Sequence, residues 1–165
     1  MMRNYSTRQF GPADWQEYKA IRLEALQTER AVYCASYEEQ STFPDELWQE
    51  RLANVACAYF GLYAGNELIG MSGIMCDPHH EHEAELIASY IRKEYRGKGL
   101  SKLFYQARIE WARKAGLKKL VISHRESNAS SKYANQGFGF QFTHQVPRHW
   151  HDGQWEDNVY YELAL

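Results

Sequence analysis

The 165-residue sequence lacks several features that define common classes of protein. No apolar run approaches the roughly 20 residues needed to cross a bilayer, and the first ten residues lack the apolar core of a signal peptide. The net charge is −2, without the basic excess that nucleic-acid binding usually requires. These absences predict a cytoplasmic protein with no membrane or nucleic-acid partner.

Cysteines are also few, and segments with the composition of a linker are absent. The three cysteines are an odd number without a Cys-x-x-Cys pair, which suits a reducing compartment and buried thiols rather than disulfides. No tract rich in proline, serine or glycine indicates a linker, and the 44% hydrophobic share is enough to bury a core. We therefore expect one domain over residues 1–165.

What the sequence does contain is a buried strand at 84–91 that leads through a basic, glycine-containing turn into an amphipathic helix. Apolar residues recur at helical spacing from residue 100 onward, and Gly116 follows where a left-handed residue would end the helix. The turn lies at the helix N-terminus, whose unpaired N–H groups favour an anion, and glycine lets a phosphate approach the backbone. The junction predicts a pyrophosphate site with main-chain donors.

The turn does not match two common phosphate-binding motifs. No G-x-G-x-x-G follows a strand, and G-x-x-x-x-G-K-[ST] does not occur. It instead resembles the R/Q-x-x-G-x-G/A motif of the GNAT superfamily of acyl-CoA-dependent N-acyltransferases. Ser101 departs from the Gly or Ala of that motif but is also small. The residues that carry this resemblance are Arg96, Gly97, Lys98, Gly99, Leu100 and Ser101.

Other segments are similar to the same superfamily. Residues 21–26 look like part of an opening helix, and Asn128, Ser131 and Gly139-Phe140 resemble its N-x-x-A/S element ending in Gly-Phe. The resemblance implies an α/β fold with a mixed, mostly antiparallel central sheet flanked by helices, and acetyl-CoA as acyl donor. The residues that it implies as coenzyme contacts are Tyr90 and Ile91 through their main chains, Arg96, Gly97, Lys98, Gly99, Leu100, Ser101, Lys102 and Asn128.

Local patterns predict the order of elements. Helices at 14–28 and from Pro44 onward precede the first strand signal. A hairpin turn at 64–67 joins two strands. The predicted strands are 57–63, 68–75, 84–91, 119–124, 140–146 and 159–165, with a short helix at 130–136.

Glu85 is the candidate general base. It lies 11 residues before Arg96, on the strand that enters the predicted coenzyme site, and it looks like the catalytic glutamate of the histone-acetyltransferase branch of the superfamily. Apolar neighbours would raise its pKa by desolvation if it faces inward. The alternative is a solvated carboxylate at a strand edge.

The resemblance also implies a tyrosine acid, for which two registers compete. Counting back from Gly137-Phe138 selects Tyr133, whose hydroxyl is able to donate a proton. Counting from Asn128, or back from Gly139-Phe140, selects Asn135, which is no acid. The predicted catalytic residues are Glu85 and Tyr133, with the register left open.

The segment 76–83 contains three histidines but no established metal framework. His79 and His82 would need further ligands, and no H-E-x-x-H or cysteine pair accompanies them, so we predict no metal and favour a polar loop. This loop is a candidate lining for an acceptor site, as are Tyr33, Tyr37, Glu38 and Glu39, because aromatic faces and carboxylates suit a cationic amine.

Taken together, the sequence predicts an N-acetyltransferase that transfers an acetyl group from acetyl-CoA directly to a primary amine in a ternary complex. A non-catalytic acyl-CoA-binding or sensor domain is the alternative, favoured if Glu85 and Tyr133 lie away from the site. The identity of the acceptor and the existence of a homodimer are left open.

Overall fold

A single sheet forms the centre of the molecule in the computed structural model, which describes residues 4–165. Its strands span Tyr5–Gln9 (β1), Cys57–Ala64 (β2), Glu67–Cys76 (β3), Glu83–Ile91 (β4), Lys119–Arg125 (β5), Gln141–His149 (β6) and Trp155–Ala164 (β7). They lie in the order β1-β2-β3-β4-β5-β7-β6. The pair β4–β5 is parallel and the other neighbouring pairs are antiparallel. The predicted mixed, mostly antiparallel sheet is confirmed, while residues 1–3 of the predicted domain lie outside the described part.

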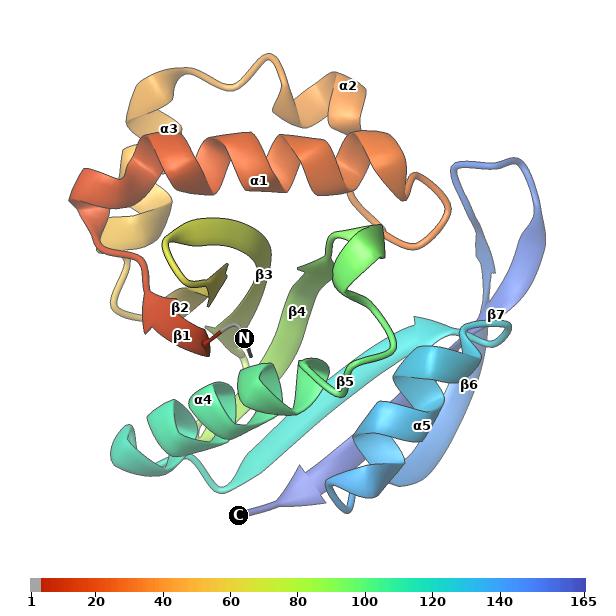
Figure 1. The fold of residues 1–165 in the computed structure, drawn as a ribbon. Coiled ribbons are helices and arrows are strands. Elements are labelled where there is room, and N and C mark those ends of the chain that lie inside the picture. The colour runs from red at the N-terminus through yellow and green to blue at the C-terminus, as the bar shows by residue number, and fades with distance from the viewer. Residues whose placement is uncertain (1–3) are drawn as a thin grey trace.

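Helices cover both faces of the sheet (Figure 1). They span Trp15–Thr28 (α1), Tyr37–Gln40 (α2), Asp45–Ala53 (α3), Ser101–Lys114 (α4) and Ala129–Gly137 (α5). On the face of α1 and α3, a core forms around Tyr18 and Trp48. On the face of α4 and α5, Tyr105 and Phe140 are buried. None of the described helices is long and apolar enough to cross a membrane.

Helix α4 forms where its apolar spacing predicts it. Phe104 and Ala112 are buried against the sheet. Gly116 has a φ of +76°, a left-handed conformation that glycine adopts without steric penalty. The N–H groups of Gly116 and Leu117 therefore bond back to the carbonyls of Arg113 and Ala112. This Schellman motif ends the helix and directs the chain into β5.

The structure differs from the sequence prediction near the N-terminus and at one cysteine. Strand β1 precedes the helices, although no strand is predicted before residue 57, and α2 is an additional short helix. All three cysteines are free, but the expectation of buried thiols is wrong for Cys34, which is exposed. Strand β1 escapes local prediction because it is short and depends on pairing with β2, far along the chain.

Strand β4 is irregular towards its end. Two of its residues, Ala88 and Ser89, stand opposite a single residue of β3, Ser72. Ala88 has a φ of +59°, uncommon for a residue with a side chain, as expected at a β-bulge. The parallel ladder to β5 stops at the pair Leu86 and Ile122, after which the two strands diverge (Figure 1). The last part of β4 is therefore an open edge.

Candidate functional site

The turn between β4 and α4 has the properties of an anion site. Gly97 and Gly99 have φ values of +76° and +73°. A Cβ atom on either glycine would meet no atom within 4 Å. No side chain caps α4, and among the described residues the N–H groups of 97–102 donate to no protein acceptor. The turn has both the space and the donors that a phosphate requires.

The side chain of Arg96 is engaged on the flank of this turn. Its Nε donates to the carbonyl oxygen of Ile91 at 2.7 Å, and its Nη2 donates to Glu29 at 2.6 Å. Lys98 Nζ lies 5.8 Å from the centre of the Tyr95 ring. Arg96 thus joins the turn to the end of α1, so its side chain is engaged while the main-chain N–H groups of the turn are free among the described residues.

A hollow of about 530 Å³ lies beside the turn. In its wall, Arg92 donates to both carboxylate oxygens of Glu24, at 3.0 and 2.9 Å, and the Tyr90 hydroxyl donates to one of them at 2.8 Å. The bonds from Arg92 hold the pKa of Glu24 below its ordinary value. The Tyr90 side chain belongs to this wall. The lining residues are Glu24, Thr28, Glu29, Tyr90, Arg92, Lys93, Glu94 and Arg96.

Glu85 is an unpaired, half-buried carboxylate in the described part of the chain. Because Leu86 is buried in the core beneath α4, the alternation of a strand places Glu85 on the opposite face. Burial raises the pKa of Glu85, and the charge of Asp77 raises it further. By contrast, Glu83 is ion-paired with Lys119 at 2.9 Å. Glu85 has the environment that a general base near neutral pH requires.

The two residues that compete for the tyrosine register have opposite environments on α5. Tyr133 is 84% exposed, and its hydroxyl has no partner among the described residues. Asn135 is 0% exposed, and both polar atoms of its amide lack a partner. Helical spacing puts Asn135 on the face of Ser131 and Tyr133 on another face. Asn135 therefore takes the interior position of α5, and the choice of Tyr133 as the acid stays a prediction.

Asn128 has a structural role at the start of α5. It is the N-cap residue, and its side-chain oxygen accepts a hydrogen bond from the Ser131 N–H at 3.1 Å. A cap of this kind satisfies one of the unpaired donors of the first helical turn. What the structure shows for Asn128 is this helix cap, and its predicted direct contact with a coenzyme stays a prediction.

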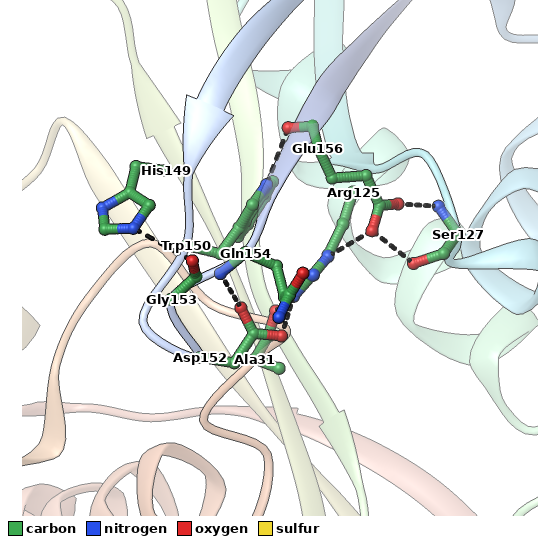
Figure 2. A network of polar contacts seen from close by, with 9 residues as sticks. All are labelled: Ala31, Arg125, Ser127, His149, Trp150, Asp152, Gly153, Gln154 and Glu156. Carbon is green, nitrogen blue, oxygen red and sulfur yellow. Dashed lines mark hydrogen bonds and ion pairs between the residues drawn. The ribbon is translucent and has the colours of Figure 1, made fainter.

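A network of polar contacts centres on Arg125 at the end of β5 (Figure 2). Its Nε donates to Glu156 at 2.7 Å, and its Nη1 donates to Asp152 at 2.7 Å and to the carbonyl oxygen of Ala31 at 3.2 Å. The guanidinium lies 5.3 Å from the ring centre of Trp150. Arg125 also lowers the pKa of Asp152. One side chain joins β5, the β6–β7 turn and the segment between α1 and α2.

The segment between α1 and α2 also reaches the bulge of β4. The Tyr33 hydroxyl donates to the carbonyl oxygen of Ser89 at 2.6 Å. Burial raises the pKa of the neighbouring Cys34 thiol, Arg148 lowers it, and Glu85 raises it. The charges of Arg148 and Glu85 therefore both act near this segment. Tyr33 and Cys34 therefore lie near the strand that carries the candidate base.

Two carboxylates of the loop at 77–83 already have partners. Asp77 and His80 are joined at 3.0 Å, and Glu83 pairs with Lys119 at 2.9 Å. Although Asp77, His80 and Glu83 bring potential ligand atoms within 4.8 Å of one another, the lysine already holds the glutamate. The interpretation as a polar loop accounts for these contacts, and the expectation of no metal stays a prediction.

Arg125 and the residues that surround it have no sequence pattern that marks them as a network. An arginine at the end of a strand resembles an ordinary solvated terminus, and its partners belong to two distant segments, around Ala31 and at 152–156. The available signal was the dipeptide Asp152-Gly153, which is typical of a turn, together with Glu156, because the two acidic residues supply two carboxylates at the tip of a hairpin. That signal does not identify the cation that binds them.

Comparisons with known proteins show the family to which the chain belongs. The model of the acetyltransferase (GNAT) family matches residues 15–140. An L-methionine sulfoximine/L-methionine sulfone acetyltransferase of Pseudomonas aeruginosa is 36% identical over 77 residues, 46% of this chain and 45% of that protein. The match therefore spans less than half of the curated relative.

Two solved structures show the similarity of the fold. An acetyltransferase of the GNAT family from Streptococcus pneumoniae has a TM-score of 0.79 at 19% identity, over 98% of this chain and 100% of that chain. A putative acetyltransferase from Salmonella typhimurium, solved with its cofactor acetyl-CoA, has a TM-score of 0.77 at 19% identity, over 98% of this chain and 94% of that chain.

Proposed function

Because this chain belongs to the GNAT family of acetyltransferases, we propose that it transfers the acetyl group of acetyl-CoA to a primary amine. The observation that carries the proposal is the open turn before α4, with its two left-handed glycines and unpaired N–H groups at 97–102. A pyrophosphate suits such a turn because oriented donors and the helix N-terminus both favour an anion. The Salmonella relative, solved with acetyl-CoA, supports the choice of donor.

Main-chain groups would hold the cosubstrate. Residues 96–102 would bind the pyrophosphate, and Tyr90 and Ile91, beyond the last pair of the β4–β5 ladder, would bind the pantetheine arm. The Ile91 carbonyl accepts from Arg96, so this bond is one that binding would have to share or replace. Asn128 would act through the position of α5, which it caps.

Glu85 would serve as the general base, directly or through a water. An amine with a pKa near 10.4 is neutral about once in 10³ molecules at pH 7, a handicap of roughly 4 to 5 kcal/mol. Glu85 would take one proton from the ammonium, which frees the nitrogen lone pair to bond to the acetyl carbon in direct transfer within a ternary complex. The second nitrogen proton would pass to water as the amide forms. Its burial and lack of an ion-pair partner support this role over that of a solvated surface carboxylate.

The acceptor would bind on the face of β4 that carries Glu85. There, Tyr33 and Cys34 come from the segment that Arg125 joins to the β6–β7 turn. The curated relative is named for L-methionine sulfoximine and L-methionine sulfone, so these two amines head the panel to be tested.

Binding and turnover are measured separately. Calorimetry with acetyl-CoA tests the cosubstrate, and release of free thiol with a panel of amines tests the reaction. We expect binding and amine-dependent thiol release. Binding without turnover on any amine would favour an acyl-CoA sensor, and no binding would contradict both functions.

The Asp77→Asn variant should shift the pH dependence of the reaction. The base must be deprotonated, so activity rises as pH increases through the pKa of Glu85, which burial and the Asp77 charge raise. Removing that charge lowers the pKa of Glu85, and the acidic limb of the kcat/KM profile should move to lower pH. An unmoved acidic limb would mean that Glu85 is not the titrating group. Glu81→Gln, on the same loop, is the control.

The Arg125→Gln variant should act on the acceptor rather than on acetyl-CoA. The change removes the bonds to Asp152 and Glu156 and releases the segments that flank Glu85. We expect the KM for the amine to rise about tenfold or more, because small displacements of positioning groups are costly. The Kd for acetyl-CoA should stay within about threefold, since the turn at 96–102 is not part of the network. An unchanged KM for the amine in a folded variant would show that the network does not position the acceptor site.

A further inference from the structure

Arg108, in the middle of α4, is a charged side chain with 0% exposure. Its Nε donates to the Phe104 carbonyl at 3.2 Å, and its Nη1 donates to the Gly73 carbonyl at 3.3 Å and to Ser89 Oγ at 3.1 Å. Among the described residues it has no carboxylate partner, and its Nη2 has no acceptor. A buried cation without an anion is unfavourable, so the protein maintains a charge here that it does not neutralise.

Ser89 is where Arg108 reaches the open edge of the sheet. It lies in the bulge of β4, beyond Leu86, the last β4 residue that pairs with β5, and it is exposed. Tyr33 fixes its carbonyl oxygen at 2.6 Å, and Arg108 donates to its hydroxyl oxygen. Among the described residues, the hydroxyl proton has no acceptor. A molecule bound along this edge would meet a free donor.

We propose that Ser89 donates a hydrogen bond to the departing coenzyme sulfur, and that Arg108 is the positioning residue that holds and polarises the Ser89 hydroxyl. The proposal rests on the acetyltransferase function proposed above. The amine nitrogen bonds to the acetyl carbon, the carbon–sulfur bond breaks, and its electron pair goes to sulfur. Glu85 takes one proton from the ammonium before the attack, and the second nitrogen proton passes to water. Sulfur leaves as a thiolate stabilised by Ser89 and takes a proton from water later.

Several contacts make this hydroxyl a strong donor. Accepting a hydrogen bond from a cation polarises its O–H bond, and the cation here is buried, so its charge is screened less than it would be in water. The Arg108 guanidinium is fixed by three acceptors and lies 5.0 Å from the ring centre of Tyr105. Burial lowers the pKa of Arg108 to about 10, so the group stays cationic at neutral pH. The donor is therefore in place before charge develops on sulfur.

This arrangement also accounts for the absence of a tyrosine at the interior position of α5. Asn135 occupies that position, and its amide has no proton to transfer to a thiolate. Tyr133, the remaining tyrosine of α5, is 84% exposed. A hydrogen bond from Ser89 stabilises the leaving group without any acid on α5.

The test compares Ser89→Ala and Arg108→Met with Ser72→Ala as the matched control. Ser72 lies opposite the bulge, and its buried hydroxyl has no partner. The first measurement is kcat with saturating amine, together with the Kd for acetyl-CoA. The second follows the ultraviolet absorbance of the thiolate against pH in the complex with free coenzyme A, which requires no turnover. Glu85 lies on the other face of β4 and is present in every variant.

We expect Ser89→Ala and Arg108→Met each to lower kcat by about 10-fold to 10²-fold, with the Kd for acetyl-CoA within about threefold. Both should raise the pKa of the bound coenzyme thiol by about one unit. The double variant should be little worse than either single variant, because the two residues act as one unit. Arg108→Lys keeps the cation and should restore part of the lost thiol shift, which a purely structural role would not predict.

Wild-type kcat and thiol pKa in Ser89→Ala would overturn the proposal, as would a loss of turnover in Tyr133→Phe in its place. If Arg108→Met does not fold, the exposed Ser89 variant still decides the question. Failure of wild-type protein to bind acetyl-CoA would contradict the proposed function itself. Binding and turnover that are indifferent to Ser89 would contradict only this inference.

Discussion

Replacing Gly99 by valine should weaken acetyl-CoA binding by about 10²-fold or more, the loss expected when several main-chain contacts to a phosphate are blocked. Gly99 has a φ of +73°, which a β-branched residue adopts only with strain. A Cβ atom there would meet no protein atom within 4 Å, so it would project into the space that the phosphate needs. Calorimetry on the folded variant measures the change in Kd.

Gly65→Val is the matched control for this experiment. Gly65 lies in the turn between β2 and β3, has a φ of +59°, and is equally free of neighbours. Both substitutions should therefore lower stability by a similar amount, about 1 to 2 kcal/mol for a left-handed residue with a side chain. Only Gly99→Val should affect the coenzyme. Unchanged affinity for acetyl-CoA in the Gly99→Val variant would show that the pyrophosphate does not bind at this turn.

Glu85→Gln should lower kcat at neutral pH by about 10² or more, in the range usual for loss of a general base. Glutamine keeps the size of the side chain but does not accept the amine proton. Acetyl-CoA affinity should remain within about threefold, because the change spares the turn at 96–102. The acidic limb of the pH profile, which we expect the raised pKa of Glu85 to produce in the wild type, should disappear.

Glu83→Gln controls for the loss of a carboxylate on the same face of the same strand. Glu83 pairs with Lys119 at 2.9 Å and has the ordinary environment of a surface ion pair. We expect a kcat close to that of the wild type. A Glu85→Gln variant with wild-type rate and pH dependence would place the base elsewhere.

The sequence predicts best where local signals and tertiary packing agree. The apolar spacing of α4, the left-handed Gly116 and the hairpin turn around Gly65 depend on nearest neighbours, and all three are confirmed. Strand β6 extends to His149, past the predicted end at residue 146, even though it contains Pro147. Proline is tolerated there because β6 is an edge strand in the described sheet.

The candidate site is harder to predict from the sequence than the fold, because its distinctive residues look ordinary in sequence. An arginine at position 108 of an amphipathic helix suggests a solvated side chain, yet Arg108 is buried against the sheet. The choice between Tyr133 and Asn135 depended on which Gly-Phe pair sets the register, and the sequence does not show that α5 buries Asn135 and exposes Tyr133. Ser89 becomes notable only once the bulge and the end of the β4–β5 ladder are known.

The strand order also bears on how the chain folds as it is synthesised. Strands β1 to β4 are adjacent in the sheet in the same order as in the chain. Each of β2, β3 and β4 therefore pairs with a strand that has already been made. The C-terminal part differs, because β7 lies between β5 and β6. Strand β6 therefore has no partner in the sheet until β7 follows it, and insertion of β7 is the step that completes the sheet. Arg125 gains its carboxylate partners only at that stage, so the network around it forms last.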